Sequence, residues 1–60
     1  MYRLFDRVLD LKSGKPCFII DVDDHGDEGV VYGIEAEDQG DPDWFRWAID
    51  SDLRKLPEHD

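Results

Sequence analysis

The sequence predicts an all-β domain built from five short strands. The chain has 60 residues, of which 40% are hydrophobic and 12% aromatic, which suits one small folded core. Glycine or proline interrupts the chain at 13–16, 25–29 and 39–43, where turns are expected. The intervening runs are rich in Val, Ile, Phe, Tyr and Trp and alternate in polarity, which favours half-buried antiparallel strands over helices. We therefore expect a single domain over 1–60 with a frayed end.

Each element follows from the residues that bound it. Four strands are expected between the turns, at 7–11, 17–23, 30–37 and 44–49. The segment 50–53 is expected to form one short 3-10 turn, capped by Asp50 or Ser51. A brief fifth strand is expected at 54–56. It should end before Pro57, because proline has no backbone N–H to donate to a strand ladder.

Alternation along the strands predicts which side chains are buried. One face of the second strand carries Phe18, Ile20 and Val22, and one face of the third carries Tyr32 and Ile34. Gly33 interrupts the third strand and predicts a bulge or sharp bend there, which lets a short sheet curl. The predicted core consists of Leu11, Phe18, Ile20, Val22, Tyr32, Ile34, Trp47, Leu53 and Leu56.

Negative charge is concentrated in the middle of the chain. The net charge is −9, and no Lys or Arg lies between Lys15 and Arg46, a span that holds ten Asp and Glu residues. Such a field disfavours nucleic acid backbones and anionic membranes, and it attracts a basic protein or peptide. The other reading is that these acids keep a small domain soluble.

Cysteine usage and hydropathy point to a soluble cytoplasmic protein. Cys17 is the only cysteine, so no disulfide can form within the chain, and secreted domains of this size usually need several. The first residues are interrupted by charges and do not resemble a signal peptide, and no apolar run approaches the ~18 residues of a membrane span. We expect no membrane association, and the short acidic chain suggests a bacterial or phage protein.

The order of strands and turns resembles a known group of folds. The segments that carry the resemblance are DRV at 6–8, SGKP at 13–16, FII at 18–20, YGIE at 32–35 and the stretch from Trp47 to Leu53. Over about 5–56 the chain resembles the SH3-like small barrels, the group that includes Tudor, chromo-barrel and KOW-type modules. Many of these modules place Gly before the DRV segment, where this chain has Phe5. KOW-type members bind RNA or the transcription machinery through basic residues, which this chain lacks.

The resemblance also implies a peptide-binding site. Such barrels bind peptides on exposed aromatics, as a cage around methyl-lysine or as a groove flanked by acids. Trp44 lies on the opposite face of its strand from Phe45 and Trp47, and we expect Trp44 to be the exposed ring. The other reading is that all these rings pack in the core. The candidate ligand-binding residues are Tyr32, Trp44, Trp47, Asp23, Asp24, Asp41 and Asp43.

Metal and catalytic chemistry find little support in the sequence. Counted from Asp21, the acidic turn fits a calcium-binding loop at Asp23 and Gly26, but His25 and Tyr32 occupy places that require oxygen ligands. Cys17 and His25 lie at different positions along one predicted hairpin, so they are not expected to form a reactive pair. Cys17 is expected to be an inert buried thiol. The sequence predicts no cofactor, no metal site and no enzyme activity.

The resulting functional hypothesis is a small interaction module that binds a basic protein or peptide through an aromatic and acidic face. Two alternatives are an acidic inhibitor that imitates nucleic acid and a subunit of a small homo-oligomer. Binding by the interaction module would depend on its aromatic side chains, whereas binding by the acidic inhibitor would depend on its charges. The oligomer is recognised by its mass in solution.

Overall fold

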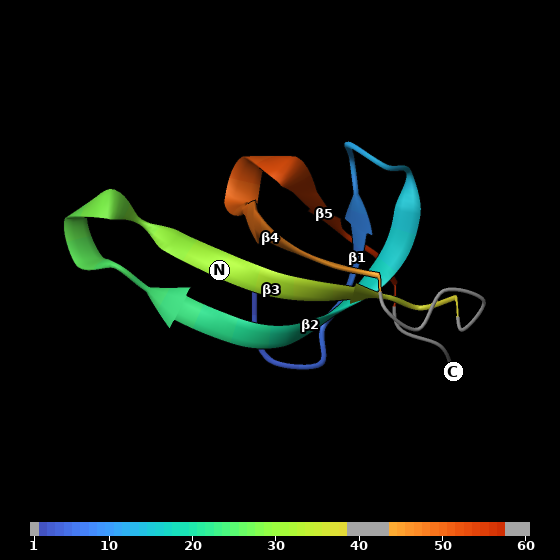
Figure 1. Cartoon of the computed structure of the whole chain (residues 1–60), viewed down its shortest axis with the longest axis horizontal. Coiled ribbons are helices and arrows are strands. Elements are labelled where there is room, and N and C mark those ends of the chain that lie inside the picture. Colours follow the sequence, from blue (N-terminus) through green and yellow to red (C-terminus); the bar gives the residue numbers. More distant parts are fainter. Residues whose placement is uncertain (1, 39–43, 58–60) are drawn as a thin grey trace.

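Five antiparallel strands form one curled sheet, a half-barrel. The computed structural model describes residues 2–38 and 44–57. The sheet has the strand order β4-β3-β2-β1-β5 (Figure 1). The strands are β1 (Arg7–Asp10), β2 (Lys15–Asp24), β3 (Val30–Ala36), β4 (Phe45–Ile49) and β5 (Leu53–Lys55). The predicted all-β class, the strand order along the chain and the short 3-10 turn before the last strand are confirmed.

The β2–β3 hairpin is the longest part of the sheet. The first residues of β2 pair with β1, and its length from Cys17 to Asp24 pairs with β3. At the far end, η1 (Gly26–Glu28) joins the two strands, and Figure 1 shows this end of the hairpin extending beyond β1, β4 and β5. The hairpin therefore carries the acidic residues of 21–28 away from the centre of the molecule.

The core lies on the concave side of the sheet. The N-terminal segment covers part of it, because the Tyr2 ring packs edge-on against Tyr32 with ring centroids 5.4 Å apart. The Tyr2 hydroxyl donates a hydrogen bond to the Leu53 carbonyl at 3.2 Å, which ties the first residues to β5. The buried apolar residues are Val8, Cys17, Ile19, Tyr32, Ile34, Ala36, Ala48 and Leu53.

The predicted core face of β2 is wrong in its first half. Cys17 and Ile19 are buried there, whereas Phe18 and Ile20 are exposed. A register shift between Ile19 and Asp21 inserts one extra residue, which changes the phase of alternation. Only Val22, beyond the shift, therefore lies on the predicted side and packs against the core.

The irregularity predicted at Gly33 lies on the neighbouring strand. Gly33 pairs with Asp21, which ends the register shift of β2, so the bulge faces Gly33 and does not contain it. Bulges of this kind bend the strand and increase its twist, which helps a short sheet to curl.

Three other sequence predictions are also wrong. Leu11 and Trp47, both expected in the core, are exposed. The last 3-10 turn, η2 (Asp50–Asp52), begins after Ile49 and has no side-chain cap from Asp50 or Ser51. Tyr32, Ile34 and Leu53 are buried as predicted, and Leu56 is half-buried.

Phe5 adopts a backbone conformation that glycine usually occupies. Its φ of 69° lies in the left-handed region, where a side chain clashes with the following carbonyl. Its N–H donates to the Ile19 carbonyl at 2.6 Å, and the Ile19 N–H donates to the Asp6 carbonyl at 3.0 Å. These bonds hold the first turn against β2 although Phe5 adopts a backbone conformation that favours glycine.

Candidate functional site

Large apolar side chains are exposed along one side of β4. The strand alternates strictly, and its Arg46 and Ala48 lie on the concave side. The opposite, convex side carries Phe45, Trp47 and Ile49, whose exposed fractions are 44%, 48% and 50%. Three such side chains in alternate positions are unusual on a solvated strand. Exposed apolar patches commonly mark interaction sites, so this side of β4 is a candidate for one.

The register of the sheet extends this side of β4 into three rows. Residues paired directly across antiparallel strands point to the same face, so each row crosses β2, β3 and β4. The rows are Phe18–Glu35–Phe45, Asp21–Gly33–Trp47 and Asp23–Val31–Ile49. We call these nine residues the outer face. Every row joins one acid to at least one large apolar side chain.

Gly33 lets the Phe45 ring lie close against β3. A Cβ atom at Gly33 would stand 3.1 Å from Cε2 of Phe45 and 3.1 Å from the Asp21 Cβ, tighter than ordinary van der Waals contact. The Phe45 ring in turn meets Trp47 edge-on, with ring centroids 5.4 Å apart and planes at 88°. The two rings and the missing side chain at Gly33 therefore form one packed aromatic surface in the middle of the outer face.

The acids of the outer face have no Lys or Arg partner among the described residues. Within 2–38 and 44–57, no Lys or Arg side chain lies within ion-pair distance of Asp21, Asp23 or Glu35. Asp23 has His25 as a neighbour, with Oδ2 and Nε2 3.1 Å apart. The negative field of this face is thus available to a cationic partner.

Most basic side chains are paired with acids elsewhere in the fold. The described ion pairs of Lys and Arg are Arg7–Glu37, Lys12–Asp52, Arg46–Asp10, Arg46–Asp52 and Lys55–Asp6. These acids lie in or beside β1, at the end of β3 and in η2. The fold therefore separates a balanced part of the molecule from an acidic part formed by β2, η1 and β3.

A depression adjoins the outer face where β4 ends. It has a volume of about 280 Å³, and its lining residues come from the η1 end of the hairpin and from the η2 region. Val30 and Ile49 supply apolar lining, and Glu28 and Asp50 supply carboxylates. Ile49 belongs both to this depression and to the outer face, so the two are continuous. The remaining lining residues are Gly29 and Ser51.

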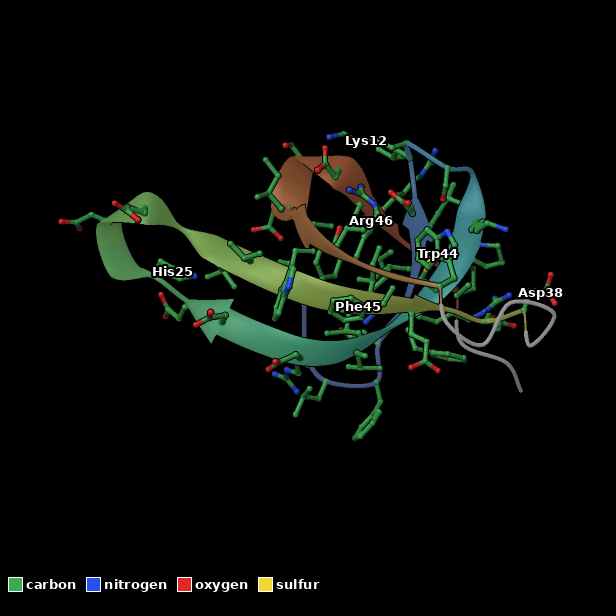
Figure 2. All side chains as sticks on the ribbon, viewed as in Figure 1. Lys12, His25, Asp38, Trp44, Phe45 and Arg46 are labelled. Carbon is green, nitrogen blue, oxygen red and sulfur yellow. The ribbon has the colours of Figure 1, made fainter. Side chains whose placement is uncertain are left out.

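The aromatic residues predicted from sequence divide between core and surface. Tyr32 is fully buried, and its hydroxyl accepts a hydrogen bond from the Tyr2 N–H at 3.1 Å. Burial is the main cause that raises the pKa of Tyr32 above its ordinary value. Trp44 is half-buried against the core, so the prediction of an exposed Trp44 is wrong. Figure 2 shows Trp44 on the side of β4 that faces β1, and Phe45 across β3.

The predicted acidic residues have different positions. Asp23 lies on the outer face, whereas the Asp24 carboxylate accepts the Gly26 N–H at 2.8 Å and stabilises the hairpin turn. Asp41 and Asp43 lie outside the described residues. The sequence-based selection missed Phe18, Asp21, Glu35, Phe45 and Ile49. The alternation in 44–49 already placed Phe45 and Trp47 on the same side of the strand. Choosing this side as the exposed one would have identified Phe45 as a site residue.

The buried Cys17 thiol is not activated by its described surroundings. Cys17 is buried, and desolvation raises the pKa of its thiol to about 11, so the thiol is protonated at neutral pH. In the segments 2–38 and 44–57, no group of three or more His, Cys, Asp or Glu side chains is placed to hold a metal ion.

Comparisons with protein-family models, curated proteins and solved structures found no match for this chain. None of the helical elements in the described residues has the length and apolar character that crossing a membrane requires.

Proposed function

We propose that this chain is a small protein-interaction module that binds a basic protein or peptide segment across the outer face and has no catalysis of its own. We also propose that its half-barrel is SH3-like. The strand order β4-β3-β2-β1-β5 and the 3-10 turn η2 directly before β5 support that assignment.

The observation that carries the functional proposal is the pairing of one acid with apolar side chains in every row of the outer face. Lys and Arg have an aliphatic stem and a charged end, so each can cover apolar surface and meet a carboxylate at once. A cation over the face of Trp47 gains a further attraction from the indole ring. A basic segment therefore suits this surface better than an acidic or purely apolar one.

The exposed rings favour this module over an acidic imitator of nucleic acid. An imitator depends on the array of charges, and Phe45, Trp47 and Ile49 contribute nothing to such an array. Trp is among the residues that most often dominate binding energy at interfaces. The proposal therefore assigns affinity to the aromatic side chains and steering to the acids.

The test is a two-dimensional amide NMR titration of labelled protein with a pool of Lys- and Arg-rich peptides. We expect the Trp47 indole N–H and the amides of Gly33 and Phe45 to shift together, saturably, and still at high salt. If only amides of 21–28 shift and salt abolishes the effect, binding is electrostatic and the imitator replaces the module. The chain carrying Leu11→Ala, which shortens an equally exposed side chain elsewhere, is the control.

The solution mass tests the third alternative. A monomer at the concentration of the titration leaves the outer face free for a partner. A dimer that Trp47→Ala dissociates and Leu11→Ala does not would show instead that this face joins identical copies, and it would contradict the proposal.

A further inference from the structure

We propose that the depression between η1 and η2 receives one lysine or arginine side chain of the basic partner, beyond the contacts made on the outer face. This inference rests on the proposed function, because it concerns a subsite for the same partner. The basic partner would therefore carry a lysine or an arginine at one end of its bound segment.

The lining of the depression matches the two chemical parts of such a side chain. Val30 and Ile49 provide apolar surface for an aliphatic stem, which both lysine and arginine possess. Glu28 and Asp50 provide carboxylates for the charged end. An apolar side chain of similar length would leave both carboxylates without a cation.

The carboxylates of Glu28 and Asp50 form no ion pair with basic side chains in the described part of the chain. Asp50 lies near the buried Tyr32 hydroxyl and, after burial, is one of the groups that raise the pKa of Tyr32.

The position of the depression fits a segment that already lies on the outer face. Ile49 ends the row Asp23–Val31–Ile49 and also lines the depression. A segment that runs along β4 over Phe45 and Trp47 therefore reaches the depression next. One bound segment can place an apolar or cationic side chain near Trp47 and a cationic one between η1 and η2.

The experiment uses the tightest-binding peptide of the Lys- and Arg-rich pool. Each of its Lys and Arg residues is replaced in turn by norleucine, which keeps an aliphatic stem and lacks the charge. Affinities are measured for the wild-type chain and for the double variant Glu28→Gln/Asp50→Asn, whose substitutions keep side-chain size. Glu28→Gln alone is measured as well, in case loss of the Asp50 charge disturbs Tyr32.

The control is the double variant Asp24→Asn/Asp27→Asn, which removes the same charge from the hairpin end outside the depression. Asparagine at 24 keeps the oxygen that accepts the Gly26 N–H. A general effect of net charge lowers affinity equally in both double variants, so any difference between them belongs to the depression.

We expect one peptide position at which norleucine weakens binding to the wild type and the control about fivefold, but hardly at all to Glu28→Gln/Asp50→Asn. The inference is overturned if every position loses the same affinity in all three proteins while Trp47→Ala still weakens binding, since the proposed function then stands without this subsite. If no peptide binds, or if Trp47→Ala binds like the wild type, the proposed function itself fails, and the inference fails with it.

Discussion

The Arg46 guanidinium donates two hydrogen bonds to the buried carboxylate of Asp10, from Nη2 to Oδ1 at 2.7 Å and from Nε to Oδ2 at 2.9 Å. Arg46 lies on β4 and Asp10 on β1, which stand three places apart in the sheet, so the pair spans the concave side of the half-barrel. Figure 2 shows Arg46 between these strands. The pair fixes the inward side of β4 and thereby sets Phe45 and Trp47 on the outer face.

The two hydrogen bonds from Arg46 to Asp10 predict that a positive charge at position 46 does not by itself maintain the stability of the fold. Arg46→Lys keeps the positive charge but loses the planar pair of donors, so we expect the free energy of unfolding to fall by about 1–2 kcal/mol. Urea unfolding followed by tryptophan fluorescence measures the change. The exposed Arg54→Lys is the matched control and should change stability little; equal values for both variants would contradict the role given to Arg46.

The same carboxylate makes stability depend on acid pH. The Arg46 hydrogen bonds, helped by the Ser13 hydroxyl at 2.7 Å, hold the pKa of Asp10 at about 2, below its ordinary value of 3.8. Because the folded pKa is lowered, the contribution is complete above about pH 4 and is lost as the pH falls towards 2. We expect this one group to account for about 2 kcal/mol of that loss.

Urea midpoints measured at several pH values between about 6 and 2 test this expectation. Ser13→Ala removes one donor to Asp10, so the folded pKa of Asp10 should rise and the variant should lose less stability than the wild type as the pH falls from about 4 to 2. Asp10→Asn, if it folds, should show a loss smaller by the contribution of Asp10. A wild-type midpoint that does not change with pH would refute the assignment.

The left-handed conformation of Phe5 predicts an inverted preference for glycine. Its side chain is 76% exposed, so shortening it removes little buried surface. At a φ of 69°, Phe5→Gly relieves a clash that Phe5→Ala retains, and we expect the glycine variant to be more stable than the alanine variant by about 1 kcal/mol. Thermal unfolding of the two variants compares them directly. Greater stability of the alanine variant would show that the turn does not require this conformation.

The close approach at Gly33 predicts coupling between two outer-face positions. Gly33→Ala places a methyl group against the Phe45 ring and the Asp21 Cβ, and it should cost about 1–2 kcal/mol of stability. In a Phe45→Ala background the ring is absent, so the cost should be smaller. A double-mutant cycle on unfolding free energies measures the coupling. Additive effects would mean that the ring does not pack on Gly33.

The strands were predictable because local signals agree with the fold. The Gly- and Pro-containing segments at 13–16 and 25–29 separate runs with a period of two, and the observed strands begin and end within about two residues of the predicted bounds. The faces of β2 were not predictable in the same way. The bulge between Ile19 and Asp21 depends on pairing with β3, and it reverses every assignment on one side of it.

The candidate site was only partly predictable for a related reason. Alternation separates Trp44 from Phe45 and Trp47 but does not say which set is buried. That choice is made by Arg46, whose inward position follows from its partner Asp10, 36 residues earlier in the chain. An expectation that rings fill the core therefore assigned Trp47 wrongly, and the structure places both Asp23 and Trp47, two of the predicted site residues, on the outer face.

The most direct test of the outer face is the affinity of Trp47→Ala for the tightest-binding Lys- and Arg-rich peptide, measured by calorimetry beside Leu11→Ala. Trp47 and Leu11 are exposed to similar extents, so both variants should remain folded, which urea unfolding checks. We predict that Trp47→Ala weakens binding tenfold or more, at ~1.4 kcal/mol or above, and that Leu11→Ala leaves it unchanged. Equal affinity of both variants and the wild type would contradict a binding site on the outer face.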